Sequence, residues 1–343
     1  MQDKRLEKKI TSLFGFDNDF KNLSELNNQL LEFGSSSVVT CDIFEGEQDY
    51  IFSLYEKLSN QEKRVRVNHQ VVFYDKNKLT NFLDSEQNLN QNDFNKIIDI
   101  KVFNDGSLGS KTAFLQNHYC DDVQNYGVLN YQVKDLIDFI EIGKKYNKQV
   151  AIHSIGDASS LNCVSAIKQA DATNTMRNKL IHFQLFDNAI IDSVINNNIL
   201  VSVQPCFLED DLVVLDKYVQ NPVATMSYDF NKVFQGNNNL VSFSTDAPVC
   251  SLNPWTNLYY AINANLIGEQ KNQNKAFDIY DAIKCYTENS AYSFFKENEL
   301  GKIAEGYLAD FIVLNQDIFS LENDLQLLDT KVTQHYISGL KVF

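Results

Sequence analysis

Two histidines and an aspartate each end a short apolar run of the sequence. His153 closes Q-V-A-I-H, His182 closes K-L-I-H, and Asp246 closes L-V-S-F-S-T-D. Imidazole nitrogens and a carboxylate oxygen suit a borderline divalent cation such as zinc. A single histidine in this setting is more often a hydrogen-bonded structural residue, so the metal prediction rests on the set. The wide spacing of the three residues suits separate β/α units and does not suit a zinc finger.

Lys101 stands where the apolar run I-I-D-I-K-V-F enters a glycine-containing loop. One interpretation is an amphipathic edge residue whose ammonium group reaches water. Two functional alternatives compete with it. A buried, deprotonated lysine can form a Schiff base with a carbonyl substrate, or it can react with carbon dioxide to give a carbamate that ligates metal.

Four further polar residues follow these runs. The loop 105–110 contains two glycines and suits an anion, but it lacks the full phosphate-binding pattern, so the nucleotide interpretation is weak. The candidates for orienting the ligands or binding substrate are Asp105, Asp157, Gln184 and Gln204. Each is alternatively an ordinary turn residue.

Seven short β-branched runs, separated by segments of helical periodicity, predict parallel strands joined by crossover helices. The predicted helices include one from Val133 and one from about Asp187, which is the predicted N-cap. An open doubly wound sheet and an eight-stranded barrel lacking one member fit this pattern equally well. Chemistry at the ends of several strands favours the barrel. The predicted strands are 36–42, 65–74, 97–103, 149–153, 179–183, 200–204 and 240–246.

A second β pattern follows the last β/α units. The segments L-G-K-I-A-E-G-Y-L-A-D-F-I-V-L-N and V-T-Q-H-Y-I-S-G-L-K-V-F predict two strands of a small sheet that needs further strands. The predicted domains are therefore an incomplete barrel, 1–300, and the C-terminal strands of a β-sandwich, 301–343.

Composition limits the classes of partner. A net charge of −15 argues against sequence-independent binding to nucleic acid, which needs clustered Lys and Arg. The six cysteines are far apart and indicate reduced thiols, and neither a signal peptide nor a membrane-spanning run is expected. We therefore expect a soluble cytoplasmic protein with a small-molecule partner.

Four segments in order resemble one family: K-V-F-N-D-G-S-L-G-S-K-T-A, V-A-I-H-S-I-G-D-A, L-I-H-F-Q-L and S-T-D-A-P-V. The resemblance is to the YtcJ-like branch of the amidohydrolase superfamily, which includes N-substituted formamide deformylase. It implies a (β/α)₈ TIM-like barrel with a composite β-sandwich, and hydrolysis of a non-peptide carbon–nitrogen bond, in amide- or formamide-like molecules, at one or two divalent ions, zinc above all.

The resemblance also implies a role for each matched residue. Lys101 would be the lysine that can be carboxylated, His153 and His182 would be metal ligands, and Asp246 would bind metal and take a proton from the attacking water. A divalent metal lowers the pKa of water and polarises a carbonyl while a carboxylate manages the proton, so each residue type has a function.

The chain departs from the family pattern at three places. Ile181 stands where the family often has Glu, Ala158 stands where it has Arg or a similar residue, and the sequence has no H-x-H pair. The missing pair belongs to the first barrel strand, which agrees with the count of seven. We expect either a truncated or split protein with a complementing N-terminal fragment, or a cover formed by residues 1–20. The chain is alternatively an inactive remnant, a binding module or, less favoured, a Schiff-base lyase using Lys101. Oligomerisation is a further possibility.

Overall fold

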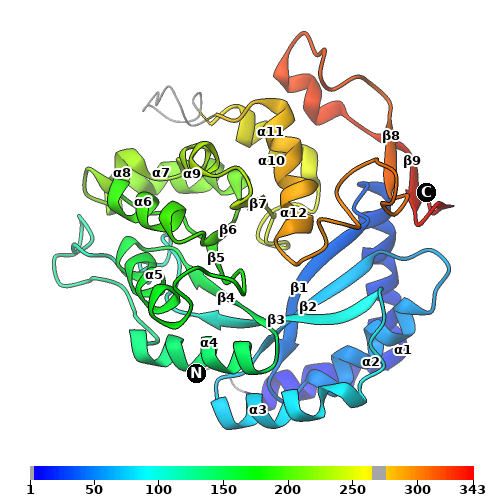
Figure 1. Cartoon of the computed structure of the whole chain (residues 1–343), viewed down its shortest axis with the longest axis horizontal. Coiled ribbons are helices and arrows are strands. Elements are labelled where there is room, and N and C mark those ends of the chain that lie inside the picture. The colour runs from blue at the N-terminus through cyan, green and yellow to red at the C-terminus, as the bar shows by residue number, and fades with distance from the viewer. Residues whose placement is uncertain (1–3, 265–275) are drawn as a thin grey trace. The chain divides into compact units, whose positions relative to one another are not determined.

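The computed structural model describes residues 4–264 and 276–343 (Figure 1). The chain forms two compact units. The first comprises the residues up to 97 together with 309–313 and 332–343, and the second comprises 98–308 and 314–331.

Seven strands are hydrogen-bonded to one another in chain order, so β1 and β7 are the terminal strands of that order. Wherever the residue register is defined between neighbours, the pairing is parallel. Each strand overlaps one predicted run, which confirms the seven parallel β/α units. The strands are β1 Ser37–Phe44, β2 Arg66–Val72, β3 Asn95–Phe103, β4 Gln149–Ser154, β5 Lys179–His182, β6 Leu200–Val203 and β7 Val241–Phe243.

In the first unit, helices cover a parallel pair of strands. The helices are α1 Lys4–Glu32, which is kinked at Gly15, α2 Gln48–Ser59, α3 Lys76–Ser85 and the 3₁₀ turn η1 Glu86–Asn88. Helix α2 packs against β1 and β2, and every residue of β2 is buried. Helix α1 packs against α2. A covering role for residues 1–20 stays a prediction, because the side chains of residues 1–14 lie outside the described part of the chain.

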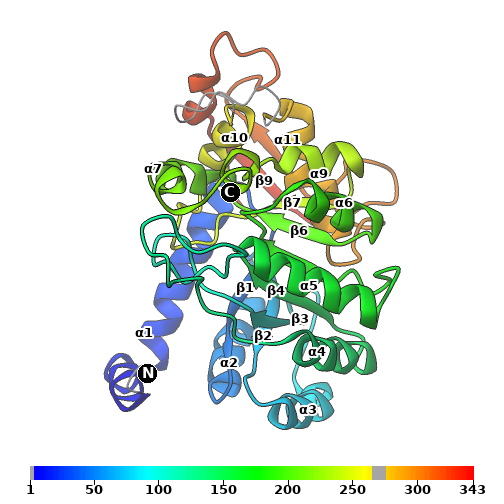
Figure 2. The same cartoon turned by 90° about the vertical axis from the view of Figure 1, so that its left-hand side faces the viewer.

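In the second unit, helices flank strands β4 to β7. Helices α4 and α5 pack against β4, and α9, α11 and α12 pack against β7; Figure 2 shows α5 beside β4. The Asp187 carboxylate accepts a 2.9 Å hydrogen bond from the Ile190 amide, which confirms the predicted N-cap. The helices are α4 Val133–Lys145, α5 Asp157–Ala170, α6 Asn188–Asn196, η2 Pro205–Phe207, α7 Leu208–Tyr218, α8 Val223–Met226, α9 Phe230–Gly236, α10 Pro254–Ile262, α11 Ile279–Tyr286, α12 Glu288–Tyr292 and η3 Asp324–Asp329.

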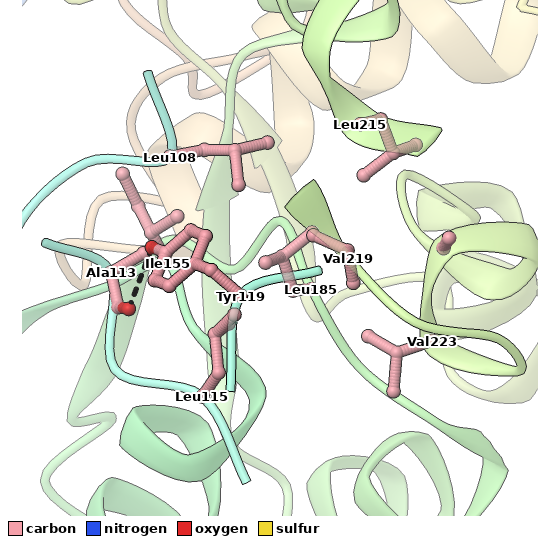
Figure 3. Packing of buried hydrophobic residues seen from close by; sticks show 10 residues of the cluster. Leu108, Ala113, Leu115, Tyr119, Ile155, Leu185, Leu215, Val219 and Val223 are labelled. Carbon is pink, nitrogen blue, oxygen red and sulfur yellow. Dashed lines mark hydrogen bonds between the residues drawn. The ribbon is translucent and has the colours of Figure 1, made fainter. Parts of the chain in front are cut away.

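A long loop, 104–132, joins β3 to α4 and is held by an apolar cluster (Figure 3). Leu108, Leu115 and Tyr119 of this loop are buried against Ile155, at the end of β4, and Leu185, just after β5. The cluster also takes in side chains of α7 and α8. Burial of this apolar surface stabilises the loop beside the C-terminal ends of the strands.

The C-terminal β pattern forms a three-stranded sheet with the order β10-β9-β8. Its strands are β8 Phe311–Leu314, β9 Val332–Ile337 and β10 Leu340–Lys341, and the β9–β10 pair is antiparallel. The domain boundary at 300/301 stays a prediction, while the compact units divide the chain elsewhere. No helix among the described residues combines the length and the apolar character that crossing a bilayer requires.

Candidate active site

The register of strands β3 and β4 brings Lys101 and His153 to one region of the sheet. Lys101 pairs with Ala151, and Phe103 pairs with His153. Because side chains alternate between the two faces of a sheet, Lys101, Phe103 and His153 share a face. The Lys101 side chain is buried, with 4% exposed, and its ammonium nitrogen lies 5.2 Å from the centre of the Phe103 ring.

His182 reaches His153 through a local change of backbone conformation. Its register partner is Ser154, and strict alternation would therefore direct the two imidazoles to opposite faces. His182 and Phe183 instead have positive φ angles of 78° and 47°, so the extended conformation ends there. The two imidazole rings lie 4.4 Å apart, centre to centre, and are tilted by 66°.

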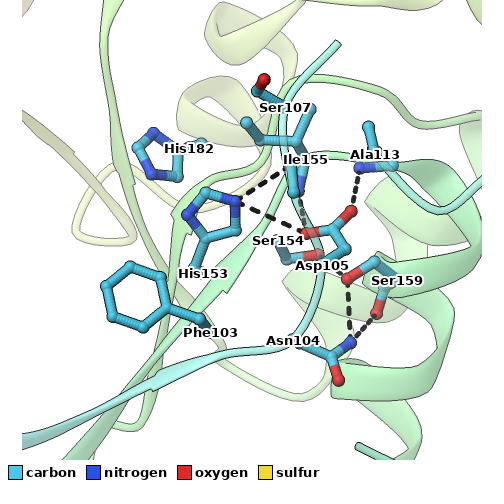
Figure 4. A network of polar contacts seen from close by, with 12 residues as sticks. Phe103, Asn104, Asp105, Ser107, Ala113, His153, Ser154, Ile155, Ser159 and His182 are labelled. Carbon is cyan, nitrogen blue, oxygen red and sulfur yellow. Dashed lines mark hydrogen bonds and ion pairs between the residues drawn. The ribbon is translucent and has the colours of Figure 1, made fainter. Parts of the chain in front are cut away.

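The surroundings of His153 fix its tautomer (Figure 4). Its Nε2 lies 3.1 Å from the carbonyl oxygen of Gly106, which can only accept a hydrogen bond, so Nε2 carries the proton. Burial, with a smaller contribution from the Lys101 charge, lowers the pKa of His153 to about 4. The ring is therefore neutral at pH 7, and Nδ1 carries the lone pair.

His182 shows the complementary arrangement. Its Nδ1 lies 2.8 Å from Oε1 of Gln204, whose amide nitrogen donates to the hydroxyl of Ser244 at 2.6 Å and to the carbonyl of Ser202 at 3.2 Å. These acceptors orient the Gln204 amide, so Nδ1 of His182 donates and Nε2 carries the lone pair. Burial, followed by the neighbouring His153 and Lys101, holds the pKa of His182 well below its usual value. The ring of Phe207 stacks on this imidazole at 5.9 Å.

Asp246 follows β7 and has a φ of 54°. Its side chain is accessible to solvent, yet the surrounding protein still raises the pKa of the carboxyl group by desolvation, and the Lys101 charge opposes that shift. The Lys101 charge thus contributes to the pKa shifts of both histidines and of Asp246.

Asp105 joins the long loop to the turn between β4 and α5. Its carboxylate accepts backbone hydrogen bonds from Phe114 at 3.0 Å, Ile155 at 3.1 Å and Gly156 at 2.8 Å, and it lies 3.6 Å from Nε2 of His153. Burial raises the pKa of Asp105 to about 7, against the opposing effect of these hydrogen bonds. Asp105 therefore holds together the two segments that flank His153.

Asp157 and Gln184, two further predicted site residues, form hydrogen bonds with other segments of the chain. Asp157 accepts from the backbone and side-chain amides of Gln116 at 3.0 and 2.9 Å. The amide nitrogen of Gln184 contacts Asp211 and Tyr228, and the Tyr228 hydroxyl donates to Asp211. Asp157 thus ties the long loop to the start of α5, and Gln184 ties the segment after β5 to α7 and to Tyr228.

Comparison with known proteins identifies the family. The model of the amidohydrolase family matches residues 18–343. The chain belongs to the amidohydrolase family. It is 33% identical over 240 residues to the putative amidohydrolase YtcJ of Bacillus subtilis, covering 68% of this chain and 45% of that protein, which confirms the predicted YtcJ-like branch. It is 29% identical over 255 residues to the protein LONG AFTER FAR-RED 3 of Arabidopsis thaliana, covering 71% of this chain and 42% of that protein.

A solved structure gives the same fold. An uncharacterised metal-dependent hydrolase from Pyrococcus furiosus superposes with a TM-score of 0.78 at 23% identity, covering 93% of this chain and 65% of that one. The predicted barrel class is confirmed by this likeness and by the seven parallel strands. The aligned part of the chain covers less than half the length of the curated relatives that it matches.

His153 and His182 fit a divalent metal in part. Each is neutral, offers one lone pair, and donates its other ring N–H to a fixed oxygen, as metal-binding histidines do. Within 4–264 and 276–343, however, no three His, Cys, Asp or Glu side chains are grouped closely enough to hold an ion. The pair therefore needs further donors, and the predicted ligand set stays a prediction.

Several contributors to this site were not predicted. The carbonyl of Gly106 and the hydroxyl of Ser244 fix the histidine tautomers, and neither residue type is distinctive in a sequence. Phe103 and Phe207 flank the histidines. Phe103 lies two residues after Lys101, and Phe207 lies in the segment directly after Gln204, so proximity to the predicted residues was the available signal.

Proposed function

We propose that this chain is the metal-binding part of a hydrolase that cleaves carbon–nitrogen bonds in small, non-peptide amide- or formamide-like molecules. The observation that carries the proposal is the buried pair His153 and His182, 4.4 Å apart and both neutral, with one lone pair each. Neutral imidazoles that donate their second N–H to fixed acceptors are suited to zinc.

The chain's own side chains would hold the ion. The donors are Nδ1 of His153, Nε2 of His182, the carboxylate of Asp246 and Lys101, the last as a carbamate formed with carbon dioxide. A divalent cation bound there would lower the pKa of a bound water and polarise the carbonyl group of the substrate. The carbamate also removes the buried positive charge that now acts on both histidines.

Asp246 is the proposed proton acceptor. Its accessible carboxylate has a raised pKa, which brings the group closer to the range in which a carboxylate accepts a proton from water and returns it to a leaving amine. Gln204 keeps His182 in the required tautomer, and Asp105 keeps the loop 104–132 against the end of β4.

In this proposal, the metal needs nitrogen donors in addition to Lys101, His153, His182 and Asp246. The sequence has no H-x-H pair, and the curated relatives are more than twice as long as the aligned part of this chain. The missing nitrogen donors would come from a complementing N-terminal segment or from another copy of the chain. The cysteines form no disulfide, which suits a reducing cytoplasm.

The test is hydrolysis of a panel of N-substituted amides and formamides by the purified chain, alone and mixed with a complementing N-terminal segment that carries an H-x-H pair, with zinc, with a chelator, and with zinc restored. We expect turnover that the chelator abolishes and zinc restores, and we expect Asp246→Asn to lower kcat by about 10²-fold or more. Asp210→Asn, in the nearby exposed acidic run of α7, is the matched control and should retain activity. Absence of turnover under every condition would support the inactive remnant or binding module.

A further inference from the structure

His335 lies inside the first compact unit, between strand β9 and the end of helix α1. Its side chain is fully buried, with 0% exposed. The backbone around it is paired with the segment 342–343, because the Val342 amide donates to the His335 carbonyl at 2.8 Å and the His335 amide donates to Phe343 at 3.1 Å. The residue that carries the imidazole is therefore held in the small sheet by backbone hydrogen bonds.

The contacts of this imidazole fix its tautomer. Nδ1 lies 3.0 Å from the carbonyl oxygen of Leu31, which can only accept a hydrogen bond, so Nδ1 carries the proton. Nε2 carries the lone pair, is buried, and has no hydrogen-bond partner within the described part of the chain. The packing beside this bond is close, since a Cβ on Gly34 would lie 3.0 Å from the side chains of Ile312 and Val332. A neutral imidazole thus links the end of α1 to β9 across a tightly packed interface.

A proton on Nε2 of His335 would meet little compensating charge. Asp310 is the nearby carboxylate, and it is already paired with the buried guanidinium of Arg66 on β2. Burial accordingly lowers the pKa of His335, against the opposing effects of the hydrogen bond to α1 and of Asp310. Further charged residues on the adjoining segments are exposed to water: Glu32, Lys341, and Phe343 with its terminal carboxylate.

We propose that His335 is a pH-sensitive clasp, which releases β9 from the end of α1 when the protein is acidified. A second ring proton has no acceptor at Nε2 among the described residues, so the imidazolium forms only when the interface opens and water reaches the ring. The opened form binds the proton near the ordinary histidine pKa of 6.5, whereas the closed form does not. Acidification below that value therefore favours the opened form. This device belongs to the first unit and holds whether or not the chain is a hydrolase.

The test is hydrogen exchange of the full chain, followed by mass spectrometry of its peptides, at several pH values from 7 to 5. Exchange rates are corrected for the pH dependence of the intrinsic rate, which gives the equilibrium constant for local opening. We expect the opening constant of the peptide 332–343 to increase by up to about tenfold per pH unit below 6.5. An equal opening constant at pH 7 and pH 5 in the wild-type protein would overturn the proposal.

Two variants assign the effect to His335. His335→Gln keeps an N–H donor for the Leu31 carbonyl but does not titrate, so its opening constant should lose the wild-type increase at low pH. His118→Gln, at a partly exposed histidine of the long loop, is the matched control and should keep that increase. Carboxyl groups such as Asp310 are present in all three proteins, so the difference from wild type is the measured quantity. The same increase in wild type and in His335→Gln would also overturn the proposal.

Discussion

The chemistry of the site depends on which nitrogen of each imidazole carries a proton. Gly106 accepts from Nε2 of His153 and Gln204 accepts from Nδ1 of His182, so the remaining lone pairs are on Nδ1 and Nε2. Neither acceptor belongs to a motif that names a function. The sequence singles out both histidines, and the structure brings their rings together. Their tautomers were not predictable, because the hydrogen-bond partners are a loop carbonyl and a side chain at the end of another strand.

Removing the acceptor of His182 should weaken metal binding. Gln204→Leu leaves Nδ1 without its oxygen partner, and we expect zinc affinity to fall by about 10- to 100-fold, as for other residues that orient a metal-binding histidine. Gln235→Leu, the same substitution at an exposed position of α9, is the control and should leave the zinc affinity unchanged. Competition with a chromophoric chelator measures both affinities, and equal affinities for wild type and Gln204→Leu would contradict the assignment.

The depressed pKa of His182 should appear as acid sensitivity of the metal-free protein. The unfolded chain binds a proton near the ordinary histidine pKa of 6.5, while folded His182 does not, so the free energy of unfolding falls as pH falls below that value. His182→Gln should remove up to about 1.4 kcal/mol per pH unit of this dependence. Asp105, whose pKa is raised, gives the opposite slope in both proteins, so the difference between them is the measured quantity. Urea unfolding measures the free energy of unfolding of both proteins from pH 7 to pH 5. The same change with pH in wild type and in His182→Gln would contradict the prediction.

At the scale of elements, the sequence predicted the strands but not the turns that end them. All seven strand positions were recognisable because buried parallel strands are short, β-branched runs. The approach of His182 to His153 depends on positive φ angles at His182 and Phe183, a conformation that is uncommon for residues other than glycine. The alternation of side chains along the strands does not predict the contact between the two imidazoles, because that contact depends on tertiary packing.

Gly156, in the turn after β4, packs against Phe114 of the long loop so closely that an added methyl group should destabilise the protein. A Cβ on Gly156 would lie 2.0 Å from the Phe114 carbonyl oxygen, although the φ of −69° suits any residue. Gly156→Ala should therefore lower the free energy of unfolding by about 1–3 kcal/mol through overpacking. Gly109→Ala, in the long loop and with open space around its Cβ position, is the control and should be near neutral. Equal unfolding midpoints in urea for the two variants would show that the contact between Gly156 and Phe114 is not close-packed.

At the scale of the whole molecule, the sequence predicted family, fold class and the count of β/α units. The domain boundary, the ligand set and the source of the missing donors remain predictions. The four residues Lys101, His153, His182 and Asp246 lie at or just beyond the C-terminal ends of four different strands, so the parallel topology puts them at the same edge of the sheet. A complete donor set was not predictable, because this chain has no H-x-H pair and aligns with less than half of each curated relative.

The most direct test of metal binding at the histidine pair is the metal content of the purified chain, by plasma mass spectrometry, with wild type and His182→Ala prepared side by side. We predict about one divalent ion per wild-type chain after equilibration with zinc, and its loss in the variant, since ligands and folded site depend on each other. Circular dichroism of both samples checks that the variant is folded. Absence of metal from both, or the same metal content in both, would contradict the assignment of His153 and His182 as the centre of the site.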